Sequence, residues 1–451
     1  MGTRSKRFLD IPDEFWIGFV FLVSFMLKLI YDIQVGYSAP TVNAGVWKLM
    51  ENGVPNEGHV GYIQYLFTCH RYPDVDPRGY ACFIDPPFFY VICALILEVI
   101  HRMMTWPIGT CLHVLQCINV IYVTIGCSHM ISMVHKFGIR GRKLVVCILF
   151  ISFFPGFYHL SSELTPNAMS FMFSMGALNH GLSWYRSRRQ KSFLTAATLL
   201  GMGLLTAWQA ILVVPALLVL YNYAIKDGRR NEISLGRQMR TDLMILIPCG
   251  IAWPLYRWIR FRIPFFYAQK SLRPYGSVAE WSVFSRIRIP GRGLFTDLHT
   301  MGVPAREYNI WAQTLKTAIF NFQSISFSRG EARVFSEFTF RVSLLLCVLF
   351  HVMWIYTMFT ARLEQPLKRF LQIGYLSYLI MYVISCLRFP YIYYMNFMRI
   401  APILIFPVIG MGVCGYGSSE DTIFEKVTSW AANGLTLVFA LVTAFVFGFY
   451  A

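Results

Sequence analysis

The chain is dominated by a succession of long apolar runs separated by short polar and basic segments. Most runs approach the length of about 17 to 25 residues that a helix needs to cross about 30 Å of hydrocarbon. Backbone groups in lipid must be satisfied within their own segment, and these runs are too long for barrel strands, so we predict helices. The predicted spans are Phe15 to Tyr31, Pro86 to Arg102, Ile108 to Val134, Lys143 to Tyr158, Thr165 to His180, Phe193 to Trp208, Ala210 to Ala224, Leu243 to Trp258, Val342 to Thr360, Leu371 to Leu387, Arg399 to Tyr416 and Trp430 to Tyr450.

This pattern predicts an all-α polytopic membrane protein with about 11 or 12 transmembrane helices in a single domain over residues 1–451. Two long loops lie between the spans, residues 32–85 and 260–341, and loops of this length usually have a function. We expect short interfacial helices in both. One is predicted within "PTVNAGVWKLMENG", and an amphipathic one carries Ile310, Leu315 and Ile319 at helical spacing, at the interface or against a partner.

Composition and charge support the membrane class and argue against a nucleic-acid-binding protein. Apolar residues make up 56% of the chain and charged residues 14%, against about 25% charged in soluble domains. The net charge of +17 lies largely in short segments such as "HKFGIRGRK" from His135, which is the positive-inside pattern, so we predict no nucleic-acid partner. The positive-inside pattern expects basic segments on the same side of the membrane. Three spans are predicted between the basic N-terminus and the His135 segment, which places these two segments on opposite sides. Either one span is miscounted or one basic cluster is lumenal.

The acidic residues of the first loop are candidates for chemistry. Asp32 follows the first span, where a membrane glycosyltransferase needs a carboxylate as base or metal holder. It has no acidic neighbour, and the favoured interpretation is a solvated group at a span boundary. Asp74 and Asp76 stand beside prolines and suit a turn better than a metal site. Asp85 precedes two prolines and is predicted to cap the next helix.

Two further polar residues, His159 and Glu163, lie near a membrane boundary. They are either functional polar groups or part of a helix start capped by Ser161 or Ser162, and the sequence favours neither interpretation.

The eleven cysteines are scattered, mostly within spans, with no Cys-x-x-Cys pair and no His/Cys cluster at metal-binding spacing. We therefore predict no metal and no cofactor. Cys69 and Cys82 of the first loop are candidates for a disulfide if this loop is lumenal. The chain also has no Gly-rich phosphate loop, no nucleophile elbow and no HExxH motif.

Four blocks occur in the order found in a known family: "SAPTVNAGVWKLMENGVPNEG" with "DPPFFYVICALI", then "GLLTAWQAILVVPALLVLYNY", "VFSEFTFRVSLLLCVLFHV" and "CGYGSSEDTIFEKVTSWAANGLTLVFAL". Together they resemble the phosphatidylinositol-glycan class U family, the multi-span subunit of the glycosylphosphatidylinositol (GPI) transamidase. That family belongs to the GT-C superfamily of polyprenyl-donor glycosyltransferases but lacks their catalytic acids. The first loop departs from the family by an insertion around "VGYIQYLFTCHRYPDVDPRG".

The resemblance implies a GT-C-like fold in the endoplasmic reticulum membrane and a non-catalytic role in attaching GPI anchors to proteins. Such a subunit binds the GPI lipid and scaffolds its partner subunits, including the protease-like catalytic one. A polar cleft that accepts the lipid phosphate and glycan has as candidate residues Asn309, Trp311, Arg388, Asn396 and Arg399.

The alternative is a dolichyl-phosphate-sugar-dependent glycosyltransferase, for example a GPI mannosyltransferase, with Asp32 as base. A transporter is less favoured, because the sequence shows no inverted repeat and no paired charges within spans.

Overall fold

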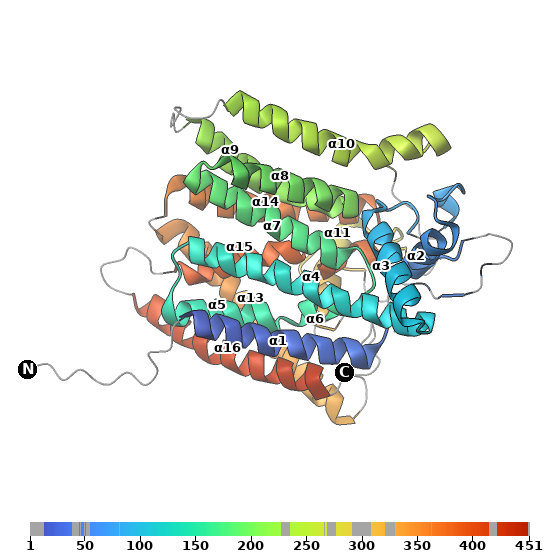
Figure 1. Cartoon of the computed structure of the whole chain (residues 1–451). Helices are drawn as coiled ribbons and strands as arrows, with labels where there is room; N and C mark the ends of the chain where they lie inside the picture. Colours follow the sequence, from blue (N-terminus) through green and yellow to red (C-terminus); the bar gives the residue numbers. More distant parts are fainter. Residues whose placement is uncertain are drawn as a thin grey trace, which may run out of the picture.

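The computed structural model describes the chain in residues 13–37, 45, 47–48, 50, 55–80, 82–226, 235–265, 267, 277–290, 308–320, 330–361, 363–414 and 422–449. Its helices pack side by side into an elongated bundle (Figure 1). The α-helices are α1 (Asp13–Val35), α2 (Gly58–Cys69), α3 (Phe88–Met104), α4 (Ile108–Lys136), α5 (Gly141–Phe153), α6 (Pro155–Ser162), α7 (Asn167–Ser187), α8 (Gln190–Thr206), α9 (Val214–Lys226), α10 (Leu235–Phe261), α11 (Val283–Ile287), α12 (Ile310–Ile319), α13 (Gly330–Thr360), α14 (Gln365–Arg388), α15 (Ile405–Gly412) and α16 (Ile423–Phe449). Short 3-10 helices are η1 (Pro77–Gly79), η2 (Trp208–Val213), η8 (Ile392–Tyr394), η9 (Phe397–Arg399) and η10 (Ala401–Leu404).

Each predicted span coincides with helical structure, which confirms the all-helical membrane class. Within the described residues, seven helical segments are long and apolar enough to cross a membrane: Ile17–Val35, Ile108–Lys136, Gly141–Ser162, Trp208–Lys226, Arg333–Thr360, Gln365–Arg388 and Ile423–Phe449. The other five predicted spans form α3, α7, α8, α10 and the η10–α15 segment.

The outer face of the bundle is apolar, as contact with lipid requires. On α13, the side chains of Leu345, Val348, Val352 and Ile355 are 42% to 53% exposed and recur every three or four residues. That spacing places them on one helix face. In water such a stripe would be costly, whereas in hydrocarbon it is matched to its surroundings.

The positions of α1, α3 and α4 resolve the conflict over the first crossings. Just after α1, the ring of Tyr37 packs against the ring of His113 in the first turns of α4, with centroids 5.0 Å apart. In Figure 1, α3 lies at this same end of the bundle, crosswise to the long helices. The chain therefore returns through α4 to the end where α1 begins. The segment after His135 therefore lies at the same end of the bundle as the start of α1. The predicted span that does not cross is Pro86 to Arg102, which forms α3.

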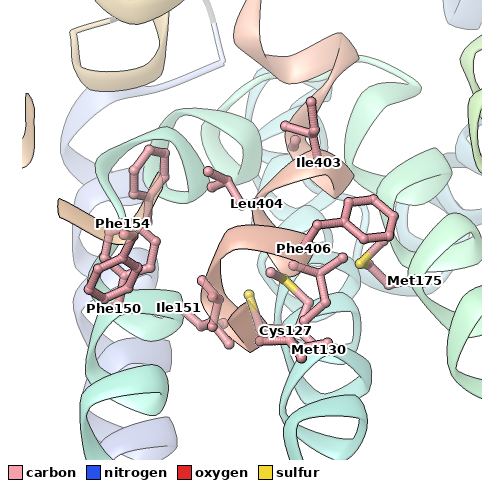
Figure 2. Close-up of a cluster of buried hydrophobic side chains, with 14 of the residues drawn as sticks. Cys127, Met130, Phe150, Ile151, Phe154, Met175, Ile403, Leu404 and Phe406 are labelled. Carbon is pink, nitrogen blue, oxygen red and sulfur yellow. The ribbon is translucent and has the colours of Figure 1, made fainter. Parts of the chain in front are cut away.

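Proline and aromatic packing shape the bundle centre. Pro155 has no backbone N–H to continue the ladder of α5, so the predicted span Lys143 to Tyr158 divides into α5 and α6 at Phe154. Side chains from α4, α5, α7, η10 and α15 meet here, including Met130, Phe150 and Phe406 (Figure 2). Lipid tails are as apolar as these side chains, so close packing rather than escape from water holds the helices together.

The structure tests one of the two predicted loop helices. Most of the first, around "PTVNAGVWKLMENG", lies outside the described residues, and the α-helix described in this loop is α2, within the insertion. In the second loop α12 forms as predicted, but its placement at an interface is wrong. Gln313, Lys316 and Thr317 are buried together with the apolar Ile310 and Ile319. The α12 helix is thus enclosed by the bundle.

Candidate functional site

Asp32 lies in the last turns of α1 and its side chain is fully buried. The Ser161 hydroxyl of α6 donates to Asp32 Oδ1 at 3.1 Å. One turn earlier, the Lys28 ammonium donates to the Ser24 hydroxyl and, at 2.8 Å, to the Ser152 carbonyl of α5. The interpretation of Asp32 as a solvated end group is therefore wrong, because its side chain is enclosed in the bundle beside Ser161 of α6.

A second buried network lies beside Asp32 and links four helices. The Tyr31 hydroxyl is 2.9 Å from His159 Nδ1, and His159 Nε2 is 2.9 Å from the Ile319 carbonyl at the end of α12. A carbonyl can only accept, so the proton of His159 is on Nε2 and the Tyr31 hydroxyl donates to Nδ1. The Phe447 ring of α16 packs against the rings of both residues.

The turn that follows α6 is held by side chains of α4. Gln116 Nε2 donates to the Ser162 carbonyl at 3.0 Å, and Asn119 Nδ2 donates to the Glu163 carbonyl at 2.6 Å. The Ser162 hydroxyl donates to the His159 carbonyl within α6, and the Ser161 oxygen lies 2.8 Å from the Tyr158 carbonyl of the same helix, which ends there. The prediction that they cap a new helix is thus wrong. Glu163 is buried with His159 in the polar interior.

In the first loop, the interpretation of Asp76 as a turn residue is confirmed, whereas Asp74 is held by two side chains. Asp76 Oδ1 accepts from the Arg78 backbone N–H at 2.9 Å and caps η1. Tyr65 donates its hydroxyl to Asp74 Oδ1 at 2.8 Å, and Arg71 pairs with Asp74 at 3.1 Å. The Tyr65 hydroxyl holds the pKa of Asp74 below its usual value, and the Arg78 side chain lowers the pKa of Asp76.

The first loop also brings together three residues with metal-binding side chains, His59 of α2 and Cys82 and Asp85 of the turn before α3. One ligand atom of each lies within 4.8 Å of the others. His59 Nε2 is 3.5 Å from Cys82 Sγ, and His59 Nδ1 is 2.7 Å from the Tyr90 hydroxyl. That hydroxyl donates to Asp85 Oδ2 at 3.3 Å. We call His59, Cys82 and Asp85 the first-loop triad.

Two predictions for this loop are corrected by the triad. The N-cap position of α3 is Pro87, and Asp85 accepts from Tyr90 within α3 instead of capping the helix. Cys69 and Cys82 are not joined by a disulfide, and the Cys82 sulfur contacts His59. The prediction that no His/Cys cluster exists missed the triad because His59 is distant in sequence. The sequence signal that could have indicated the triad is the spacing of Cys82 and Asp85 just before two prolines.

Burial and two guanidinium groups set the electrostatics of the triad. Burial, followed by the charge of Arg399, lowers the pKa of His59 to about 3. Burial raises the pKa of Cys82 and that of Asp85, and the charges of Arg399 and Arg257 oppose the rise at Asp85. The triad is thus a cluster of ligand atoms, two of them on buried residues, within the field of two cations.

Two of the predicted lipid-binding residues are engaged within the fold. Asn309 Oδ1 accepts from the backbone N–H groups of Trp311 and Ala312, both at 3.1 Å, and so caps α12. Its Nδ2 donates to the Arg288 carbonyl at 2.7 Å, and Trp311 Nε1 donates to the Ile287 carbonyl at 2.6 Å. These side chains fasten α12 to α11.

The other three predicted residues lie near the end of α14. Asn396 caps η9 by accepting a backbone N–H at 2.9 Å. The exposed Arg388 guanidinium lies over a neighbouring ring, and the half-buried Arg399 guanidinium lies 4.4 Å from the centre of the Tyr394 ring. Arg399 also acts on the first-loop triad electrostatically, so the structure brings one predicted lipid-binding residue close to that cluster.

Fold and site together define an all-helical polytopic membrane protein with buried polar side chains inside its bundle. No protein-family model matches the chain, and no curated protein sequence matches it. Among solved structures, it is similar to ArnT from Cupriavidus metallidurans bound to undecaprenyl phosphate, at 14% identity over 96% of this chain and 78% of that one, with a TM-score of 0.41. It is also similar to the Archaeoglobus fulgidus oligosaccharyltransferase in the apo form, at 13% identity and a TM-score of 0.48. That match covers 97% of this chain and 56% of the archaeal one, so the chain spans little more than half of it.

Proposed function

We propose that this chain is a non-catalytic membrane subunit of a GPI transamidase, which holds the GPI lipid and positions the partner subunits, including the protease-like one. The four sequence blocks that resemble the phosphatidylinositol-glycan class U family support this role. The observation that carries it is the complete burial of Asp32. The location that goes with it is the endoplasmic reticulum membrane.

The burial of Asp32 argues against the alternative, a polyprenyl-donor glycosyltransferase. A general base must come within about 2.6–3.2 Å of the proton that it takes, and a catalytic metal needs an open position for substrate. Asp32 has no exposed surface, and Ser161 donates to one of its oxygens. A carboxylate enclosed in this way suits a structural partner inside the bundle better than a base that meets an acceptor sugar.

Lipid binding is assigned to Arg388, the last residue of α14, and Arg399 of η9. A guanidinium group gives two parallel hydrogen bonds to a phosphate, so arginine is well suited to a lipid headgroup. Arg388 is exposed and Arg399 is half-buried, with its guanidinium over the Tyr394 ring. The phosphate of the GPI lipid is proposed to meet Arg399, with Arg388 nearer the bundle surface.

The test is native purification of the tagged full chain from cells in which it replaces the endogenous copy. Mass spectrometry identifies the co-purifying proteins, and surface display of a GPI-anchored reporter measures attachment. Asp32→Asn keeps an acceptor for the Ser161 hydroxyl, so we expect unchanged partners and unchanged display. Asp32→Leu removes that acceptor and serves as the matched variant for loss of the hydrogen bond.

The proposal fails if Asp32→Asn accumulates and assembles normally but abolishes function. It also fails if the isolated wild-type chain transfers a sugar from a polyprenyl carrier. A further variant, Arg399→Gln, is expected to keep the partner subunits and reduce reporter display, because it removes charge without changing the bundle core.

A further inference from the structure

We propose that the first-loop triad is a Zn²⁺ site, in which His59 Nε2, Cys82 Sγ and a carboxylate oxygen of Asp85 bind the ion and tie α2 to the turn before α3. This inference does not depend on the proposed function. Its three ligand residues are used neither by the GPI-binding proposal nor by the glycosyltransferase alternative.

The distance between the nitrogen and the sulfur fits zinc. With Zn–N of about 2.0–2.1 Å and Zn–S of about 2.3 Å at a tetrahedral angle, the two ligand atoms are about 3.6 Å apart. His59 Nε2 and Cys82 Sγ are 3.5 Å apart. The carboxylate oxygen, within 4.8 Å of the other ligand atoms, needs to approach by about 1 Å, which a rotation of the half-buried Asp85 side chain provides.

The surroundings orient the ligands as metal sites require. A metal-bound histidine usually donates its second ring N–H to a neighbouring group, which fixes the ring. Here the Tyr90 hydroxyl lies 2.7 Å from His59 Nδ1 and donates onward to Asp85 Oδ2. With the proton of His59 on Nδ1, its Nε2 lone pair faces Cys82. The His59 ring also stacks on the Tyr90 ring, with an interplanar angle of 10°.

The turn that carries the other two ligands is held from outside. The Ile84 carbonyl, between Cys82 and Asp85, accepts from Trp253 Nε1 at 2.9 Å and from the Arg257 guanidinium at 3.2 Å. Cys82 adopts a φ of 70°, in the left-handed region that non-glycine residues avoid. Such strain concentrates at functional sites, and here it turns the sulfur toward α2.

The donor set and the charges select the ion. One imidazole nitrogen, one thiolate and one carboxylate are zinc ligands, whereas Mg²⁺ and Ca²⁺ prefer oxygen alone. The thiolate and the carboxylate balance the two charges of the ion. Arg399 and Arg257 then favour an oxygen ligand, water or a small anion, at the fourth position.

The alternative is that Cys82 simply donates its S–H to His59 Nε2. Metal content separates the two cases.

The full chain is purified with its co-purifying partners in detergent without chelator, equilibrated with ZnCl₂ and freed of excess metal. Elemental mass spectrometry then gives the zinc content per chain. We expect Cys82→Ser and His59→Gln to hold one zinc ion fewer than wild type, and Cys69→Ser, a neighbouring loop cysteine outside the triad, to match wild type.

A second measurement needs only the wild-type chain. The rate at which a maleimide alkylates each cysteine is read by peptide mass spectrometry with and without Zn²⁺. Zinc is expected to slow alkylation of Cys82 at least tenfold and to leave Cys69 unchanged. Equal zinc content in wild type and Cys82→Ser, or alkylation of Cys82 that ignores Zn²⁺, overturns the proposal. These readouts do not involve GPI attachment, so failure of the zinc site and failure of the proposed function are told apart.

Discussion

Replacing Tyr31 by Phe removes the hydroxyl that donates to His159 across the contact between α1 and α6. A buried group left without its partner costs about 1–3 kcal/mol. Hydrogen bonds between membrane helices are weaker on average, about 0.6 kcal/mol and at most about 1.7. His159→Leu also strands the Ile319 carbonyl, which lies 2.9 Å from Nε2, so its loss is expected to be larger, about 2–4 kcal/mol.

His159→Leu also removes a ring that packs against Phe447, so the pair is best measured by a double-mutant cycle. We expect a coupling energy of about 0.5–1.7 kcal/mol between Tyr31→Phe and His159→Leu. The free energy of unfolding of the four proteins is measured in mixed micelles with increasing denaturing detergent, followed by circular dichroism. Tyr37→Phe is the matched control, because within the described residues the Tyr37 hydroxyl makes no hydrogen bond. It is expected to leave the unfolding free energy unchanged.

Additive effects of the two variants, within about 0.3–0.5 kcal/mol, would refute the reasoning. They would mean that His159 and Tyr31 contribute through packing alone.

Three further variants test the fold by the same micelle titration. Gly156→Ala places a Cβ 2.9 Å from a backbone carbonyl of α12 and should lower the free energy of unfolding by about 1–3 kcal/mol. The control Gly434→Ala meets no atom within 4 Å and should leave that free energy unchanged or raise it by up to about 1 kcal/mol. Equal effects of the two variants would contradict the close contact at Gly156. Asn309→Ala removes the cap of α12 and should cost about 1–2 kcal/mol, and a silent variant would show that the cap is dispensable. Arg257→Met removes a hydrogen-bond donor to the Ile84 carbonyl in the turn before α3 and should lower the free energy of unfolding by about 1–3 kcal/mol. An unchanged free energy would show that other contacts hold this turn.

The errors of the sequence interpretation share a cause. Asp32 looked like a solvated end group, and α12 looked like a surface helix with its polar side outward, because both were judged by local sequence alone. In the fold, Ser161 supplies a partner for Asp32, and α12 is covered on both its apolar and polar sides. Local turns were predicted correctly, since Asp76 meets its partner Arg78 within two residues.

The sequence by itself determined that the chain is an all-helical membrane protein and roughly where its long apolar helices run, because the length of an apolar run and the demand for internal backbone hydrogen bonds are local properties. Only the tertiary structure decided which of its polar residues meet. His59 faces Cys82 because α2 packs against the turn before α3, and Tyr31 reaches His159 because α1 lies against α6. Apolar packing brings these helices together without regard to distance along the chain, so contacts between remote polar groups follow from the fold and are not encoded in any local pattern.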